Sequence, residues 1–110
     1  MKTSLFNDTI ENIRTAADII RDGGLVAFPT ETVYGLGADA LNSEAVGKVY
    51  TAKGRPSDNP MIVHIAETSE LAGLTDDISE DMRVLMDKFW PGPMTMIVRR
   101  KDIVPDVTTG

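Results

Sequence analysis

Three short segments divide the chain, because neither a helix nor a central strand continues through them. They are Gly23-Gly24, residues 54–60 and residues 90–93, and all are rich in glycine or proline. Glycine accepts the left-handed conformation that ends a helix, and proline lacks the backbone N–H that a helix interior or a central strand needs. Each segment follows a stretch with helical spacing and precedes a short, mainly apolar run. Helices that alternate with strands in this way predict an α/β sheet.

The stretches with helical spacing each carry an apolar stripe. We expect the first helix to begin at Asp8, with Glu11 completing a capping box. The second is expected from Asn42 or Ser43 to about residue 51, and the third after Asp77 as its cap; residues 70–74 allow a further short helix. The stripes are Ile10, Ile13, Ala17 and Ile20 in the first helix, Val46, Val49 and Tyr50 in the second, and Met82, Leu85, Met86 and Phe89 in the third.

Four segments are predicted to be extended. Residues 25–28 form a continuous apolar run, which is typical of a strand covered on both faces. Residues 61–65 are predicted to be another buried strand, and residues 94–98 a further strand. Residues 33–39 are predicted to form another extended piece, in which Gly35 and Gly37 allow close backbone approach. Residues 103–110 show neither a helix pattern nor a polar tail, so we expect residues 1–110 to be the N-terminal part of a single, truncated domain.

Composition excludes several kinds of site. The chain has no cysteine and one histidine, which rules out disulfides, thiolate chemistry, cysteine-rich zinc sites and multi-histidine metal sites within it. No apolar run of signal-peptide type follows the first residues, and no apolar stretch is long enough to span a bilayer. We therefore expect a cytoplasmic protein that makes no use of a membrane.

The charges are unevenly distributed along the sequence. The net charge is −6, with a group of acids in residues 76–87 and groups of basic residues at Lys53, Arg55 and 99–101. We expect residues 99–101 to be a solvated strand end. A nucleic-acid-binding protein usually presents a broad basic face, so this pattern favours a local anionic ligand such as a triphosphate. An RNA-binding module remains the alternative of a different class.

Two cations and one histidine lie around residues 54–60, the second of the three segments that interrupt helices and strands. We call these three segments breakers. Lys53 and Arg55 are two positions apart with Gly54 between them, so in an extended stretch both would point to one side, toward phosphate oxygens. The alternative, which spacing alone favours, is a solvated basic turn. His64 lies in the predicted strand that follows Asn59 and the intervening Pro60, and is either a ligand-binding residue or a satisfied core histidine.

Residues 29–37 follow the first predicted strand and hold small hydroxyls, one carboxylate and two glycines. In open α/β sheets, ligands bind beyond the carboxyl ends of strands, so this segment is a candidate ligand loop. The alternative is a tight turn that needs its glycines.

Four segments together resemble the YrdC-like family. They are GLVAFPTETVYGLG at residues 24–37, KGRP at 53–56, NPMIVH at 59–64 and FWPGPMT at 89–95, in the order of the family. The resemblance covers most of the chain and implies a twisted mixed α/β sheet with flanking helices and a concave cleft.

The resemblance also implies a reaction. Members of this family are threonylcarbamoyl-AMP synthases, nucleotidyltransferases that join L-threonine, bicarbonate and ATP into L-threonylcarbamoyladenylate and release pyrophosphate. A partner transferase then passes the threonylcarbamoyl group to adenosine at position 37 of tRNA. Two alternatives share the fold, namely a carbamoyl-transfer domain of the hydrogenase-maturation type and a double-stranded RNA or tRNA-binding module, and a third is a non-catalytic relative that keeps the cleft.

Carried over by position, the resemblance implies roles for five residues. Thr32 and His64 would contact L-threonine, and Lys53, Arg55 and Asn59 would contact ATP. Lys53 and Arg55 would also be catalytic, because fixed cations stabilise the charge that builds on phosphorus and on the leaving pyrophosphate.

The resemblance implies two further features of the site. Mg²⁺ is expected on the triphosphate, with Glu31 as a candidate ligand from this chain. The family signature has a downstream Ser-x-Asn element, and Ser57-Asp58-Asn59 matches only its spelling, because it belongs to the loop after the basic pair. We therefore expect the true element beyond Gly110 and half of the site within this chain.

Overall fold

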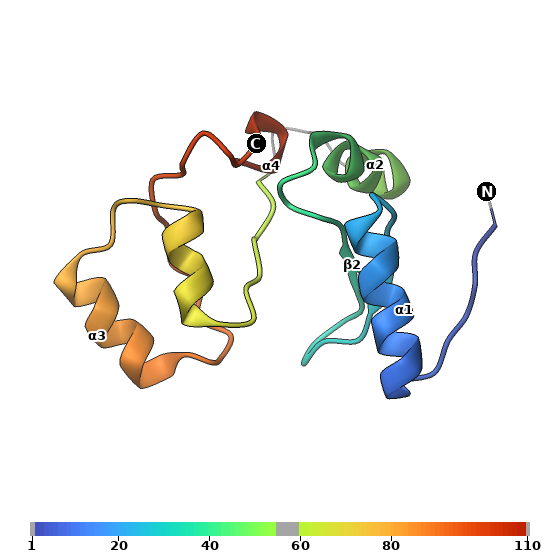
Figure 1. Cartoon of the computed structure of the whole chain (residues 1–110), viewed down its shortest axis with the longest axis horizontal. Coiled ribbons are helices and arrows are strands. Elements are labelled where there is room, and N and C mark those ends of the chain that lie inside the picture. Colours follow the sequence, from blue (N-terminus) through green and yellow to red (C-terminus); the bar gives the residue numbers. More distant parts are fainter. Residues whose placement is uncertain (1, 55–59, 110) are drawn as a thin grey trace.

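The computed structural model describes residues 2–54 and 60–109, which fold around a small sheet and a set of short helices (Figure 1). No helix in these ranges is both long enough and apolar enough to cross a membrane. Figure 1 shows α1, the sheet and α2 in one half of the molecule and α3 in the other, with α4 next to α2. The elements, in chain order, are α1 (Ile10–Arg21), β1 (Val26–Phe28), β2 (Gly35–Gly37), α2 (Ser43–Lys53), the 3₁₀ helix η1 (Thr68–Gly73), α3 (Glu80–Phe89) and α4 (Asp106–Thr109).

Two predicted helix starts are wrong by one or two residues. Thr9, not Asp8, caps α1, and its hydroxyl accepts a 3.2 Å hydrogen bond from the Asn12 amide. Ser79, not Asp77, caps α3 by accepting a 3.2 Å hydrogen bond from the Met82 amide, and the Asp77 amide donates to the Thr75 hydroxyl in the preceding turn. A hydroxyl satisfies an orphan amide of the first turn as well as a carboxylate does, so the choice depends on where the preceding turn ends.

The ends of the helices follow the breakers as predicted. Gly23 adopts a φ of +90° after α1, and Gly54 a φ of +63° after α2, which is a left-handed cap. α3 ends at Phe89, immediately before the cis Trp90–Pro91 bond, and η1 confirms the predicted short helix.

The sheet is smaller than predicted. β1 and β2 form an antiparallel pair in which Phe28 lies opposite Gly35 and Val26 opposite Gly37. β1 is not covered on both faces as expected, since Ala27 and Phe28 are exposed. The reason is that α1 packs near β1, while the described residues place no second layer over the other side of this two-stranded ribbon.

The strands predicted at residues 61–65 and 94–98 do not form in the described part of the chain. Burial nevertheless alternates along both segments with the period of a strand, every second side chain being partly buried and its neighbours exposed. A strand also needs a backbone ladder with a neighbour, and neither segment has one within residues 2–54 and 60–109. The side-chain pattern is therefore present without the pairing that defines a sheet.

α2 is the best-buried helix, and the predicted inward positions of Val46, Val49 and Tyr50 are confirmed. Asn42 caps it by accepting a 3.1 Å hydrogen bond from the Ala45 amide. Its inward face packs against α4, and the buried side chains are Ala45, Val46, Val49 and Tyr50. By contrast, no residue of α1 is buried, and of the α3 stripe only Met86 is. The described core is therefore centred on α2 and α4.

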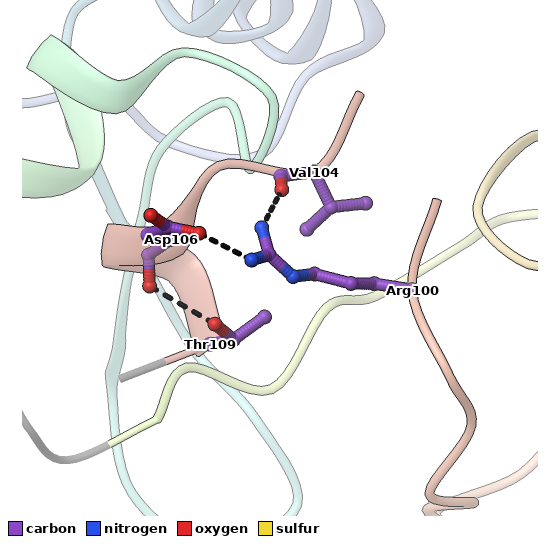
Figure 2. A network of polar contacts seen from close by, with 4 residues as sticks. All are labelled: Arg100, Val104, Asp106 and Thr109. Carbon is purple, nitrogen blue, oxygen red and sulfur yellow. Dashed lines mark hydrogen bonds and ion pairs between the residues drawn. The ribbon is translucent and has the colours of Figure 1, made fainter. Parts of the chain in front are cut away.

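α4 is a helix that the sequence did not predict. It is held in place by Arg100, whose guanidinium donates to the Val104 carbonyl and pairs with Asp106 in the first turn (Figure 2). Lys101 donates to the Ala72 carbonyl at 2.6 Å and pairs with Asp76 at 3.2 Å. The expectation that residues 99–101 are a solvated strand end is therefore wrong, because two of these cations hold neighbouring backbone in place.

Thr108 joins three segments that lie far apart in the sequence. Its side chain is buried, and its hydroxyl donates to the Ala40 carbonyl at 2.7 Å. Its own carbonyl accepts from the Met61 amide at 2.9 Å, and the Tyr50 hydroxyl donates to the adjacent Val107 carbonyl at 3.1 Å. α4 therefore fixes the loop before α2, α2 itself and the start of residues 60–65 relative to one another.

This geometry predicts that Thr108→Val destabilises the chain. Valine keeps the shape of the buried side chain but leaves the Ala40 carbonyl without its donor, which should cost about 1–3 kcal/mol in the free energy of unfolding. The matched control is Thr109→Val, because the exposed Thr109 hydroxyl also donates to a backbone carbonyl, that of Asp106. Urea unfolding monitored by circular dichroism measures both variants. Equal effects of the two substitutions would contradict the role given to Thr108.

Candidate functional site

A cleft of about 1050 Å³ lies between the sheet, the end of α2, residues 60–65 and η1. Ala40 and Met61, whose backbone groups form hydrogen bonds with Thr108, are both part of its wall, so the position of α4 shapes the cleft. Other wall residues carry hydroxyl, cationic, imidazole and carboxylate groups, namely Thr30, Tyr34, Asp39, Lys53, His64, Ser69 and Glu70. A smaller hollow of about 330 Å³ lies between η1 and α3.

Lys53 brings a positive charge to the cleft from the last turn of α2. Its exposed ammonium has no carboxylate within ion-pair distance among the residues that the structure describes. The last turn of a helix favours a cation, which suits a lysine at this position. The left-handed conformation of Gly54 then ends the helix directly after it. Lys53 is therefore available to an anionic ligand.

His64 enters the same cleft from residues 60–65. Its Nδ1 lies 2.9 Å from the Ile62 carbonyl oxygen. A carbonyl can only accept, so Nδ1 carries the hydrogen of this contact, and in the neutral ring Nε2 is then left as an acceptor. The structure therefore brings Lys53 and His64, which are separated by the second breaker, to one cavity.

Thr32 and Glu31 are exposed residues of the loop that follows β1. Thr32 lies between the wall residues Thr30 and Val33, and its hydroxyl oxygen is 3.5 Å from that of Thr30. Neither Thr32 nor Glu31 is itself a wall residue. Arg55 and Asn59, the other two residues predicted to contact ATP, lie outside the described residues.

Five polar wall residues were not singled out from the sequence, namely Thr30, Tyr34, Asp39, Ser69 and Glu70. Thr30 and Tyr34 belong to the predicted ligand loop, so their neighbourhood was identified but not their individual contribution. Glu70 comes from η1, and one of its carboxylate oxygens accepts hydrogen bonds from the amides of Ala66 and Glu67. No local signal could have placed Glu70 at the cleft, because its position depends on how η1 packs.

The described residues hold no group of three or more His, Asp or Glu side chains that could bind a metal ion. Glu31 is exposed and has no second carboxylate beside it in such a group.

The aromatic ring of Phe28 forms part of the cleft wall by lying over β2. A Cβ atom at Gly37 would be 2.8 Å from the Phe28 ring, and one at Gly35 would be 3.4 Å from it. The prediction that these glycines allow a close approach is confirmed, and the approaching group is the ring of Phe28, which lies opposite Gly35 and diagonal to Gly37.

A sequence model of the Sua5/YciO/YrdC family, described as "Telomere recombination", matches residues 18–110. The chain belongs to the Sua5/YciO/YrdC family. It is 54% identical over 98 residues to the threonylcarbamoyl-AMP synthase of Pyrococcus abyssi, and that match covers 89% of this chain and 29% of the relative. The Bacillus subtilis threonylcarbamoyl-AMP synthase is 55% identical over 100 residues, again with 89% of this chain and 29% of the relative covered.

Solved structures show the same fold in this family. The crystal structure of Pyrococcus abyssi Sua5 complexed with L-threonine is similar with a TM-score of 0.85 and 52% identity, over 89% of this chain and 29% of that one. A solution structure from Methanobacterium thermoautotrophicum is similar with a TM-score of 0.69 and 32% identity, over 100% of this chain and 52% of that one. The expected YrdC-like α/β fold is confirmed, and the chain spans a minor part of its Sua5 relatives.

The packing of Phe28 predicts opposite effects for two glycine substitutions in this family member. Gly37→Ala should displace the Phe28 ring and cost about 1–3 kcal/mol of stability, as overpacking does. Gly47→Ala is the matched control, because its Cβ would meet nothing within 4 Å inside α2 and should stabilise by about 0.5–1 kcal/mol. Urea unfolding of the two variants checks the signs. A Gly37→Ala protein as stable as the unaltered chain would show that Phe28 does not pack on β2.

Proposed function

We propose that this chain forms part of a threonylcarbamoyl-AMP synthase, which makes L-threonylcarbamoyladenylate and pyrophosphate from L-threonine, bicarbonate and ATP. The observation that carries the proposal is that one cleft holds Lys53 and His64 together, with Thr32 on the loop beside it. A relative that is 52% identical was crystallised with L-threonine, which supports an amino-acid ligand for this cleft.

The reaction joins two anions and therefore needs positive charge. The threonine nitrogen attacks carbon dioxide derived from bicarbonate, forms an N–C bond and loses a proton, which yields a carbamate. A carbamate oxygen then attacks the α-phosphorus of ATP, and the bond from that phosphorus to the bridging oxygen breaks to release pyrophosphate. Negative charge increases on the leaving group, so fixed cations nearby lower the barrier.

The residues of the cleft suit these steps. The exposed ammonium of Lys53 would contact the phosphates, and the Nε2 acceptor of His64 would receive a hydrogen bond from L-threonine. Thr32 completes the proposed amino-acid contacts, and Arg55 and Asn59 the nucleotide contacts. Holding both substrates in one cleft supplies the positioning that such a bimolecular step requires. Magnesium enters as part of the substrate, Mg-ATP.

The proposed product is an activated mixed anhydride, so a second enzyme must use it. We propose that a threonylcarbamoyl transferase passes the group to adenosine at position 37 of tRNA, in the cytoplasm, where ATP and tRNA are available. Direct binding of tRNA to this chain is disfavoured by its net charge of −6.

The proposal predicts that Lys53→Met impairs synthesis. Removing one fixed cation should lower kcat for pyrophosphate release about 10²–10³-fold, as loss of an electrostatic stabiliser does. The assay measures ATP-dependent pyrophosphate release that requires both L-threonine and bicarbonate, in the protein that contains this chain. Lys48→Met is the control, because Lys48 lies on the same helix but donates to the Gly23 carbonyl and is not a wall residue. Pyrophosphate release that does not depend on L-threonine would refute the proposed function.

We further propose that residues 1–110 are the N-terminal part of a single YrdC-like domain. Support comes from the alternating burial of residues 61–65 and 94–98, whose exposed members include Ile62 at 62% and Ile97 at 97%. The match to only 29% of the length of two relatives is consistent with further strands that pair with these segments.

This domain proposal predicts a change in amide hydrogen exchange. In a chain extended to the length of the relatives, amides of residues 62–65 and 95–98 should exchange on the order of 100-fold more slowly than in this chain, because a ladder protects them. Amides of α2 serve as the internal reference. Equally fast exchange of both segments in the longer chain would contradict the pairing.

A further inference from the structure

The hydroxyl of Thr30 lies at the centre of the loop after β1. It donates a hydrogen bond to the Val33 carbonyl and accepts one from the Thr32 amide at 3.3 Å. The same oxygen is 3.5 Å from the Thr32 hydroxyl oxygen. The Thr30 hydroxyl thus contacts the Thr32 amide and the Val33 carbonyl. It also contacts the Thr32 hydroxyl, the group proposed to bind L-threonine.

The single hydrogen of the Thr30 hydroxyl determines which residue donates in the contact between the Thr30 and Thr32 hydroxyls. A hydroxyl has one hydrogen and two acceptor lone pairs. The Val33 carbonyl can only accept, so the hydrogen of Thr30 is directed to it, and the Thr30 oxygen acts as an acceptor toward Thr32. Between the two hydroxyls, Thr32 is therefore the donor. At 3.5 Å this contact is long for an O–H···O bond, so it biases the Thr32 hydrogen without locking it.

The methyl group of Thr30 also restricts the rotamer of this side chain. A Cβ atom at Gly35 would lie 3.5 Å from the Thr30 methyl carbon and 3.4 Å from the ring of Phe28. The methyl therefore lies over the start of β2 beside that ring, while the hydroxyl faces the loop. β-branched side chains have few χ1 choices, so these two contacts together select the rotamer.

We propose that Thr30 is the positioning residue of the amino-acid site. Its hydroxyl holds the loop that carries Thr32 and directs the hydroxyl hydrogen of Thr32 toward the Thr30 oxygen. The lone pairs of the Thr32 oxygen can then accept a hydrogen bond from a donor group of the ligand. The matching chemistry on L-threonine is its N–H or O–H. This inference rests on the proposed function, because it takes L-threonine as the ligand and Thr32 as its contact.

The test is isothermal titration of L-threonine into the protein containing this chain and its variants. Thr30→Val removes the hydroxyl but keeps the methyl, and should raise the Kd about 3–10-fold, the range for one hydrogen bond. Thr30→Ser keeps the hydroxyl and should restore most of the affinity. Thr15→Val is the matched control, because the Thr15 hydroxyl also donates to a backbone carbonyl but lies on α1, outside the cleft wall.

A double variant separates positioning from direct contact. Thr32→Val should weaken L-threonine binding, and Thr30→Val combined with it should add little, because Thr30 acts through Thr32. The Kd for Mg-ATP in the absence of L-threonine should be the same in Thr30→Val as in the unaltered protein, which excludes general damage. If Thr30→Val does not fold, Thr30→Ala replaces it, since it also removes the hydroxyl.

Several results would overturn the inference. Losses that multiply in the double variant would mean that Thr30 acts independently of Thr32. Equal losses in Thr30→Val and Thr30→Ser would exclude the hydroxyl as the cause, and unchanged binding in Thr30→Val or Thr32→Val would remove the positioning role while L-threonine binding stands. Failure of the unaltered protein to bind L-threonine would instead overturn the proposed function, and this inference with it.

Discussion

The docking of α4 on α2 is the interaction on which the rest of the described structure depends. Thr108 contributes its hydroxyl to the Ala40 carbonyl and its carbonyl to the Met61 amide, and both partners line the cleft. This contact joins the loop before α2 to residues 60–65, which follow α2 in the chain. Lys53 and His64 come from the segments that this helix holds together, so the site depends on a helix that contributes no wall residue.

α4 itself depends on side chains outside it. A helix of four residues is too short to be stable alone, because nucleation is costly and few internal hydrogen bonds are gained. Arg100 compensates by bridging the Val104 carbonyl and Asp106 at the helix start, and the buried Tyr50 hydroxyl binds the Val107 carbonyl. α4 is thus stabilised by an ion pair at the surface and by a hydrogen bond from a buried side chain.

Local signals predicted the helices better than the strands. The cap at Asn42, the left-handed glycines and the Trp90–Pro93 breaker act within a few residues, so their effects can be read from sequence. Strands depend on partners that the local sequence does not specify, and for this reason residues 61–65 and 94–98 kept their side-chain alternation but gained no ladder. α4 was missed because its stability comes from Arg100, six residues before Asp106.

In the candidate site, too, some features could be predicted from local sequence and others depended on tertiary packing. The shared cleft for Lys53 and His64 followed from motif order, whereas the place of Glu70 depended on the packing of η1. The hydrogen-bond direction at Thr30 needed coordinates, since a hydroxyl can donate or accept until its neighbours are known.

The exposed isoleucines of residues 61–65 and 94–98 have a practical consequence for work with the isolated chain. Segments with strand-like alternation and no ladder can pair with the same segments of other molecules, and Ile97 offers an almost fully solvated apolar side chain for that encounter. Self-association would then compete with ligand binding, and more strongly at higher protein concentration. Solubility, and not only affinity, sets the conditions under which this cleft can be studied.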